Sequence, residues 1–264
     1  WLIENSEQFC QEKAVYNAIM ESIQILDDDT KALDKGAIPQ ILADALSVSF
    51  DNHVGHDFIA DAEERYEFYH RVESSIPFDL DYMNRITKNG LPNKTLNIIL
   101  AGTGVGKSLA MCHFAAANLT QGKNVLYITL EMSEEKIAER IDANLMNTPL
   151  DYLHQLSKDE YMNKISKIKS KTKGKLIVKE YPTASANVSH FKHLINDVKL
   201  KKQFKPDIIY IDYLNICSSS RMRASATVNS YTLIKSIAEE LRGMAVEYDV
   251  PIVSATQTTR GGFA

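Results

Sequence analysis

The sequence predicts an α/β fold with a mainly parallel central sheet, preceded by a helical linker segment. From Thr95 onward, short apolar runs alternate with segments of helical periodicity. A glycine-rich loop joins the first of these runs to a helical segment, and the stretch from Lys31 to Phe78 shows no strand periodicity. Strands that alternate with helices pair in parallel, because each crossover helix returns the chain to the same end of the sheet.

Five short apolar runs predict the strands of this sheet. They are apolar on both faces, as strands covered by helices on both sides are. The runs are Leu96–Leu100, Val125–Leu130, Leu176–Val178, Ile208–Ile211 and Pro251–Ala255. Ligands of such sheets bind beyond the carboxyl ends of the strands, so we expect the function to lie in the strand-to-helix loops.

Helical periodicity predicts two helices that cover the sheet and one helix near the start of the chain. The two covering helices carry apolar residues at helical spacing over 188–198 and 233–248. The early helix runs from Ser6 to about Asp29, and its apolar stripe is formed by Val15, Ile19, Ile23 and Leu26. We therefore expect an amphipathic helix ahead of the sheet.

The chain is predicted to divide into a helical linker region, residues 1–80, and an α/β domain, residues 81–264. The stretch from Lys31 to Phe78 holds a second apolar patch around 41–48 and acidic sequence that ends at a proline. The chain begins without Met and stops in loop-like sequence at Ala264. We expect a piece of a longer protein, truncated at its C-terminus.

Amino-acid composition excludes several classes of protein. Of the 264 residues, 44% are apolar and 24% are charged, which is typical of a soluble globular protein. The net charge of -4 gives no overall basic footprint, so any contact with nucleic acid must come from local patches. Three scattered cysteines suggest neither a disulfide framework nor a zinc knuckle, and favour a cytoplasmic setting. No long apolar run or signal peptide is present, so we expect no membrane partner.

Residues 101–108, Ala-Gly-Thr-Gly-Val-Gly-Lys-Ser, form the most specific motif. The loop follows a predicted strand and precedes a helix that we expect to start near Leu109. Its amide N–H groups converge on phosphates, Lys107 reaches the terminal phosphates, and the Ser108 hydroxyl ligates Mg²⁺. Ala101 replaces the first glycine of the strict pattern, and a structural turn without nucleotide is the alternative. We expect Mg²⁺ with ATP or GTP, bound by Gly102, Thr103, Gly104, Val105, Gly106, Lys107 and Ser108.

Three polar residues stand at the ends of predicted strands. Asp212 fits a Walker B carboxylate that holds the magnesium shell, with an ordinary strand-end cap as the alternative. Glu131 is a candidate base for the attacking water, or else a first-turn glutamate of a helix that begins near Ser133. Gln257 is a candidate sensor of the γ-phosphate, or else a loop amide.

Two weaker patterns are interpreted as structural. The histidine pairs His53/His56 and His190/His193 lack a third ligand cluster, so we expect no metal there. A lysine-rich stretch alternates with apolar residues as the solvated face of a helix does. Its members are Lys164, Lys167, Lys169, Lys171, Lys173 and Lys175.

In their order, these motifs resemble the DnaB-like hexameric replicative DNA helicases of superfamily 4, including those of T-even bacteriophages. The resemblance covers most of the chain. It rests on Asp79-Leu80-Asp81, Gly90-Leu91, Leu130-Glu131-Met132, Ile211-Asp212-Tyr213-Leu214, and Val250-Pro251-Ile252-Val253 leading to Gln257 and Arg260. It implies a RecA-like P-loop NTPase core in which Lys107, Glu131 and Gln257 serve catalysis, Asp212 is the Walker B carboxylate, and Arg140 lies near the nucleotide.

The resemblance also implies an activity and partners. Members of the family couple Mg-NTP hydrolysis to 5′ to 3′ translocation on single-stranded DNA and unwind duplexes at the replication fork. We expect Arg221, Arg223 and Arg260 to contact DNA, with mobile surface loops as the alternative. Expected partners are single-stranded DNA, five further copies in a homo-hexamer, primase and a helicase loader. The setting would be the cytoplasm, that of the bacterial host if a phage encodes the chain.

Two other classes of protein remain compatible with the sequence. A RecA-type recombinase and a nucleotide-gated assembly ATPase share the same core. The family usually supplies an arginine finger from beyond the glutamine motif, so we expect this chain to hydrolyse NTP weakly. The N-terminal collar domain of the family is also expected to be absent. The helix over 6–29 is expected to pack on an adjacent motor domain, or else on its own.

Overall fold

The structure is a computed structural model that describes residues 2–27, 37–46, 48, 55–70, 74–222 and 229–258. The chain forms two compact units, Trp1–Val72 and Glu73–Ala264. The boundary predicted from the sequence, after residue 80, lies eight residues further along the chain than this division.

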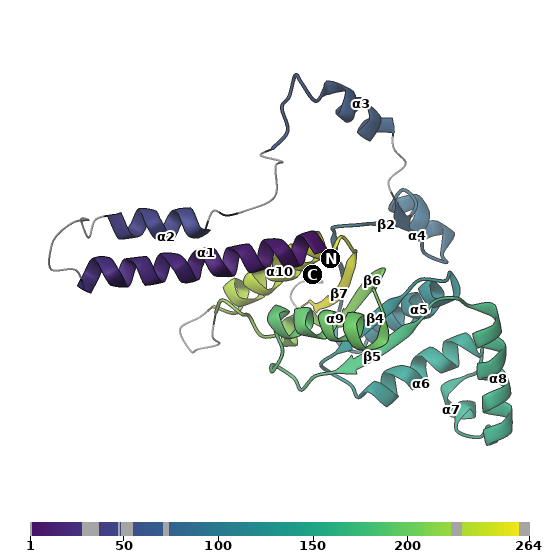
Figure 1. Cartoon of the computed structure of the whole chain (residues 1–264). Coiled ribbons are helices and arrows are strands. Elements are labelled where there is room, and N and C mark those ends of the chain that lie inside the picture. Colours follow the sequence, from purple (N-terminus) through teal and green to yellow (C-terminus); the bar gives the residue numbers. More distant parts are fainter. Residues whose placement is uncertain are drawn as a thin grey trace. The chain divides into compact units, whose positions relative to one another are not determined.

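The first unit is helical in its described residues (Figure 1). It contains α1 (Leu2–Asp27), α2 (Ile38–Leu46) and α3 (Ala62–His70). The expected early helix is therefore present, and α2 coincides with the second apolar patch. Helices α1 and α2 pack side by side, with Ala18 and Ala45 buried.

The buried face of α1 differs from the predicted stripe. Ala18, Ser22 and Ile25 are buried, whereas Ile19 and Ile23 remain 47% and 46% exposed. Small residues line the buried face because they allow a neighbouring helix to approach closely. The predicted apolar stripe thus stays largely available on the surface of α1.

The second unit is built on a five-stranded parallel sheet. Its strand order is β3-β7-β6-β4-β5. The strands are β3 (Leu96–Ala101), β4 (Val125–Thr129), β5 (Leu176–Glu180), β6 (Ile208–Asp212) and β7 (Ile252–Gln257). All five predicted runs are strands, and the parallel pairing is confirmed. A small antiparallel pair, β1 (Ser75–Ile76) with β2 (Leu91–Pro92), was not expected.

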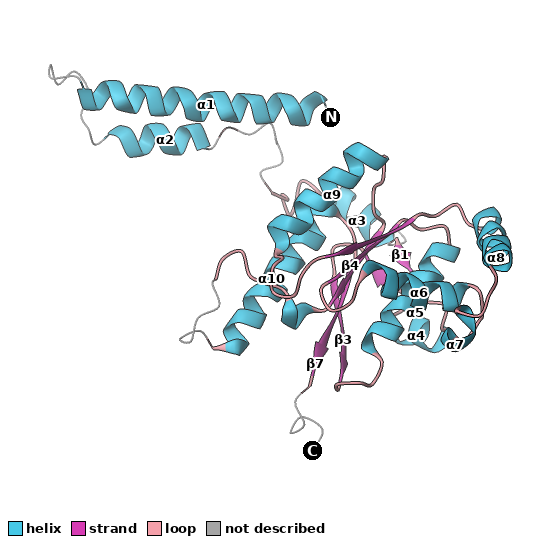
Figure 2. Cartoon of the chain, turned by 90° about the horizontal axis from the view of Figure 1, so that it is seen from below, coloured by secondary structure: helices cyan, strands magenta, loops and turns pink. Residues whose placement is uncertain are grey.

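Helices cover both faces of the sheet (Figure 2). Helices α5 (Lys107–Thr120) and α6 (Glu134–Leu145) share one apolar cluster with one face of the sheet. Helices α9 (Val188–Lys202) and α10 (Ser230–Tyr248) share a second cluster with the other face. The remaining elements are α4 (Asp81–Ile86), α7 (Leu150–Leu153), α8 (Lys158–Lys171) and the 3-10 turn η2 (Leu214–Ile216). This arrangement is the predicted RecA-like core.

The register of the strands aligns their carboxyl ends. Thr129 of β4 pairs with Asp212 of β6, and Ala101 of β3 pairs with Gln257 of β7. The amide of Leu130 donates to the carbonyl of Asp212 at 2.8 Å, which ties the two strand ends together. Because the strands are parallel, the loops that leave these ends emerge on one edge of the sheet.

Candidate nucleotide-binding site

The glycine-rich loop connects β3 to α5 at this edge. Gly104 and Gly106 both adopt positive φ, 76° and 107°, a backbone conformation that glycine reaches without strain. Helix α5 begins at Lys107, two residues earlier than the sequence suggested, with Gly106 as its N-cap. Gly106 supplies no capping side chain, so the amides of the first turn are directed at the space above the loop.

Lys107 lies across the loop rather than in solvent. The residue is only 8% exposed, and its Nζ donates a hydrogen bond to the carbonyl of Gly102 at 3.0 Å. The same ammonium lies 5.8 Å from the centroid of the Tyr213 ring. Its positive charge is therefore concentrated at the loop, where phosphate oxygens are bound in proteins of this loop type.

A cavity of about 230 Å³ opens beside the loop and joins three of the strand ends. The structure brings most of the predicted nucleotide-site residues together on its walls, along with two residues that sequence reasoning missed, Leu109 and Met132. Its lining residues are Thr103, Gly104, Gly106, Lys107, Ser108, Leu109, Glu131, Met132, Arg140 and Gln257. Positive and negative side chains thus converge on one space, as a nucleotide site requires.

Asp212 stands at the end of β6 and is fully buried. Its Oδ2 accepts a hydrogen bond from the Tyr127 hydroxyl at 3.0 Å, whereas its Oδ1 has no hydrogen-bond partner in the described part of the chain. A buried carboxylate oxygen without a partner is costly unless a cation or donor meets it. Together with the Ser108 hydroxyl, this donor set of hard oxygens fits Mg²⁺.

The electrostatics of Asp212 agree with that fit. Burial raises the pKa of Asp212 above its usual value, because a low dielectric disfavours the charged form. Hydrogen bonds from Ser108 and Tyr127 oppose the rise, as do the positive charges of Arg140 and Lys107. Arg140, a half-buried residue of α6, also lines the cavity beside the loop.

Glu131 lies on the cavity wall, in the turn that follows β4. The amide of Met132 donates to Thr129 Oγ1 at 3.1 Å, and that hydroxyl donates back to the Met132 carbonyl at 2.9 Å. These bonds fix the turn that carries Glu131. Helix α6 begins at Glu134 with Ser133 as N-cap, so Glu131 lies outside its first turn and the first-turn alternative is wrong.

Gln257 is the last residue of β7 and lies opposite Ala101, the first residue of the loop motif. The amide of Thr258 donates to the Ala101 carbonyl at 3.3 Å, which holds the end of β7 against the start of the loop. Gln257 also lines the cavity, so it is a wall residue of the site rather than a remote loop amide.

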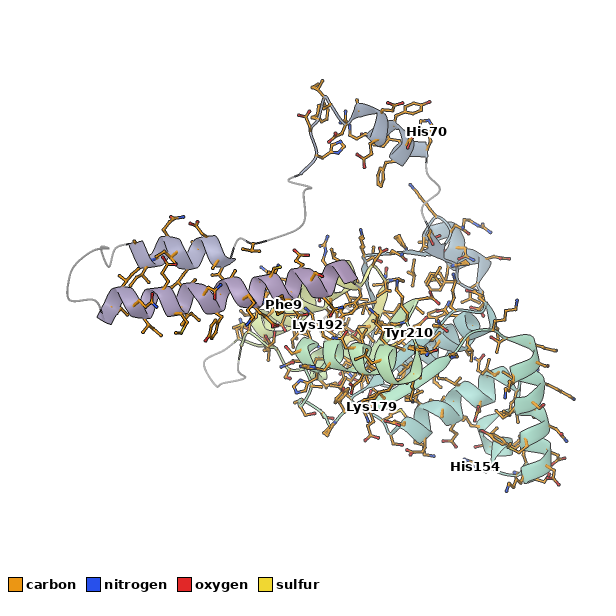
Figure 3. The ribbon with its side chains drawn as sticks, in the orientation of Figure 1. Phe9, His70, His154, Lys179, Lys192 and Tyr210 are labelled. Atoms are coloured by element: carbon orange, nitrogen blue, oxygen red, sulfur yellow. The ribbon has the colours of Figure 1, made fainter. Side chains whose placement is uncertain are left out.

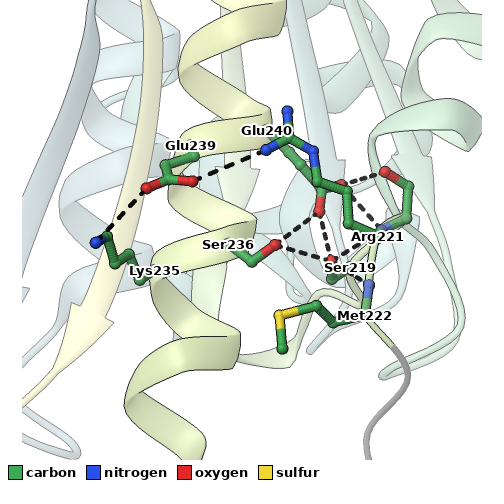
Figure 4. Close-up of polar contacts among 8 residues, drawn as sticks. Ser219, Arg221, Met222, Lys235, Ser236, Glu239 and Glu240 are labelled. Atoms are coloured by element: carbon green, nitrogen blue, oxygen red, sulfur yellow. Dashed lines mark hydrogen bonds and ion pairs between the residues drawn. The ribbon is translucent and has the colours of Figure 1, made fainter.

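The predicted DNA-contacting residues lie apart from the cavity or outside the described residues. Arg221 is exposed, and its Nη1 lies 3.8 Å from Glu239 Oε2 on α10. The buried Glu240 accepts hydrogen bonds from Ser219, Ser220 and Ser236 and so anchors the chain just before Arg221 (Figure 4). Arg223 and Arg260 are not among the described residues, and their role stays a prediction.

The two structural interpretations have different outcomes. Lys164, Lys167, Lys169 and Lys171 lie on α8, whereas Lys173 and Lys175 follow it in a loop. All six lysines except Lys164 are exposed, as a solvated face requires. His190 completes a capping box with Asn187 at the start of α9. For His56 the argument from a missing third ligand is wrong, because Asp61 and Glu64 offer ligand atoms within 4.8 Å. This cluster lies at the surface, and His53 falls outside the described residues.

The family model for the DnaB-like helicase C-terminal domain matches residues 75–262. The chain belongs to this family. The match spans the second unit, including the loop motif, Glu131, Asp212 and Gln257. Proteins of this family are NTP-hydrolysing, which agrees with a P-loop at the edge of the sheet.

Known proteins support this assignment. The DnaB-like replicative helicase of Enterobacteria phage T4 is 45% identical over 97% of this chain, which covers 56% of that protein. The chain thus spans about half the length of that curated relative. Two solved structures share the fold. The first, a DnaB-like replicative helicase studied with primase, has a TM-score of 0.58 and 19% identity, and the match covers 97% of this chain and 60% of that one. The second, a separately solved ATPase domain, has a TM-score of 0.59 and 20% identity, and the match covers 77% of this chain and 70% of that one.

Among the residues that the structure describes, no helix is both long enough and apolar enough to cross a bilayer.

Proposed function

We propose that this chain is the motor domain of a replicative DNA helicase. It would couple hydrolysis of Mg²⁺-bound ATP, or another NTP, to 5′ to 3′ movement on single-stranded DNA and to unwinding at the replication fork. The observation that carries the proposal is the convergence of Lys107, Glu131 and Gln257 on one cavity, in a chain of the DnaB-like family.

The site residues have distinct proposed roles. The loop amides and Lys107 bind the phosphates, and the Ser108 hydroxyl and the free Oδ1 of Asp212 hold Mg²⁺. When bound, the metal neutralises charge on the β- and γ-phosphates. Glu131 orients or deprotonates the attacking water, and Gln257 senses the γ-phosphate.

Neighbouring residues complete the proposed site. Arg140, on the cavity wall, adds positive charge to the proposed site. The exposed Arg221 follows the same strand as Asp212, which suits a phosphate contact coupled to the state of the site. Arg223 and Arg260 are proposed to act with it.

Assembly is the second part of the proposal. Apolar side chains along α1, including Tyr16, Ile19 and Ile23, stay exposed, which supports packing of this helix against the motor domain of another copy. A homo-hexamer around single-stranded DNA is consistent with family membership and is part of the proposal, and primase and a helicase loader are its proposed partners. Given the phage relative, the proposed setting is the cytoplasm of a bacterial host.

The test is the rate of NTP hydrolysis with and without a single-stranded oligonucleotide. We expect DNA to raise the rate, and Glu131→Gln to lower it by about 100-fold or more because a general base is lost. Arg221→Ala should raise the oligonucleotide concentration needed for half-maximal stimulation. The matched control, Lys192→Ala, removes a surface cation that pairs with Glu247 and should leave that concentration unchanged. Hydrolysis that ignores DNA would favour an assembly ATPase instead.

A further inference from the structure

The two oxygens of the Asp212 carboxylate have unequal surroundings. The Tyr127 hydroxyl donates to Oδ2 at 3.0 Å, and Oδ1 is buried with no partner among the described residues. The Tyr127 hydroxyl therefore occupies Oδ2, and Oδ1 remains the oxygen without a partner. The hydroxyl of a tyrosine can serve as that donor because it carries one proton and accepts through its lone pairs.

The sheet register explains why Tyr127 reaches Asp212 from another strand. Tyr127 of β4 pairs with Tyr210 of β6, and residues two apart on a strand point to the same face. Asp212 therefore lies on the same face as Tyr210 and is a diagonal neighbour of Tyr127. Diagonal neighbours in a sheet lie within reach of an aromatic side chain.

The Tyr127 side chain is held in place by contacts with Tyr210 and Cys112. It is completely buried, and it stacks on the Tyr210 ring with centroids 5.8 Å apart and an interplanar angle of 12°. The Cys112 thiol donates to its hydroxyl, with the sulfur at 3.8 Å. Cys112 lies one helical turn after Ser108 on α5, so the two side chains share a helix face. This network links the helix that follows the P-loop to the carboxylate of β6.

We propose that Tyr127 is a positioning residue of the metal site, whose hydroxyl occupies Asp212 Oδ2 and so reserves Oδ1 as the ligand beside Ser108. The proposal rests on the Mg-NTP site proposed above. Groups that hydrogen-bond a metal ligand commonly change metal affinity about 10-fold to 100-fold when they are removed. Tyr127 is placed to have this effect without touching the metal.

Tyr210 provides a matched control for a purely structural role. Its side chain is 1% exposed in the interior of the second unit (Figure 3), and it shares the ring stack with Tyr127. Its hydroxyl instead donates to Asn118 Oδ1 at 2.6 Å. Loss of the Tyr210 hydroxyl removes its buried hydrogen bond to Asn118, whereas loss of the Tyr127 hydroxyl removes the bond to Asp212 and the weak bond from the Cys112 thiol. Only the second loss frees Asp212.

The experiment measures Mn²⁺ affinity by electron paramagnetic resonance in the presence of a non-hydrolysable ATP analogue. We expect Tyr127→Phe to weaken Mn²⁺ binding about 10-fold and Tyr210→Phe to leave it within twofold of wild type. Binding of the analogue in EDTA should be unchanged in both variants. Asp212→Asn serves as the reference for loss of the metal ligand, and thermal unfolding reports whether each variant is folded.

The outcomes separate the two proposals. If Asp212→Asn weakens Mn²⁺ binding but Tyr127→Phe does not, or if both Phe variants weaken it equally, the positioning role is wrong and the metal site stands. If Asp212→Asn itself has no effect, the proposed metal site fails. Should Tyr127→Phe not fold, Cys112→Ala probes the same network from its other end. A smaller loss of Mn²⁺ affinity is then expected, and wild-type affinity would overturn the proposal.

Discussion

Asp212 and Glu240 are both buried carboxylates whose hydrogen bonding differs, and their pKa values shift in opposite directions. Burial by itself acts to raise the pKa of both groups. At Asp212 burial prevails, and one oxygen has no partner in the described part of the chain. At Glu240 the hydrogen bonds donated by Ser219, Ser220 and Ser236 outweigh burial, so its pKa is lowered. Asp212 therefore has an oxygen available to bind a cation, whereas the hydrogen bonds of Glu240 already stabilise the folded chain.

Glu240 should therefore make stability depend on pH. Its folded pKa lies below its unfolded value, so its charged form stabilises the fold above about pH 4.3, and this stabilisation is lost as the pH falls through the folded pKa. We expect Glu240→Gln to lower the free energy of unfolding by about 2 kcal/mol at pH 7. The difference from wild type should shrink towards pH 3, as measured by denaturant unfolding.

The control for this prediction is Glu247→Gln. Glu247 lies on the same helix, α10, but forms an exposed pair with Lys192, so its loss should change stability little at any pH. A Glu240→Gln difference that stays constant from pH 7 to pH 3 would contradict the role assigned to the charged form.

At the scale of elements, the loop motif was predictable because its signal is local. Eight consecutive residues specify the turn, and the glycines at 104 and 106 take the positive φ that the turn demands. The buried face of α1 was not predictable in this way, because it depends on where α2 packs. The turn that holds Glu131 was also missed, since it forms through the Thr129 hydroxyl and not through a helix cap.

Two glycines should respond in opposite ways to the same substitution. A Cβ on Gly90, at φ 114°, would lie 2.2 Å from the backbone oxygen of Ile76, whereas a Cβ on Gly243 in α10 would meet nothing within 4 Å. We expect Gly90→Ala to destabilise the chain by more than about 1 kcal/mol and Gly243→Ala to stabilise it by about 0.5–1 kcal/mol. Thermal unfolding of both variants measures the difference, and equal shifts of the same sign would contradict the account of Gly90.

At the scale of the whole molecule, the sequence identified the strands and the residues at their ends, but not the order of the strands. The contact between Tyr127 and Asp212 spans 85 positions and exists only because β4 lies next to β6. No local pattern carries that information. The strand-end residues were found because parallel strands direct their carboxyl ends to one edge in any order.

The net charge of -4 limits how strongly the chain as a whole can attract nucleotide and DNA. Such a chain has no general attraction for polyanions, so binding of nucleotide and DNA has to come from local groups. Lys107, Arg140 and Arg221 are the described cations that this account assigns to those tasks.

The measurement that tests the account most directly is equilibrium binding of a fluorescent ATP analogue with Mg²⁺, for the wild type, Lys107→Ala and the surface control Lys192→Ala. We expect Lys107→Ala to weaken binding at least about 10-fold, or 1.4 kcal/mol, because the ammonium held at the loop is lost. Lys192→Ala should bind as the wild type does. Wild-type affinity in Lys107→Ala would contradict the assignment of this edge of the sheet as the nucleotide site.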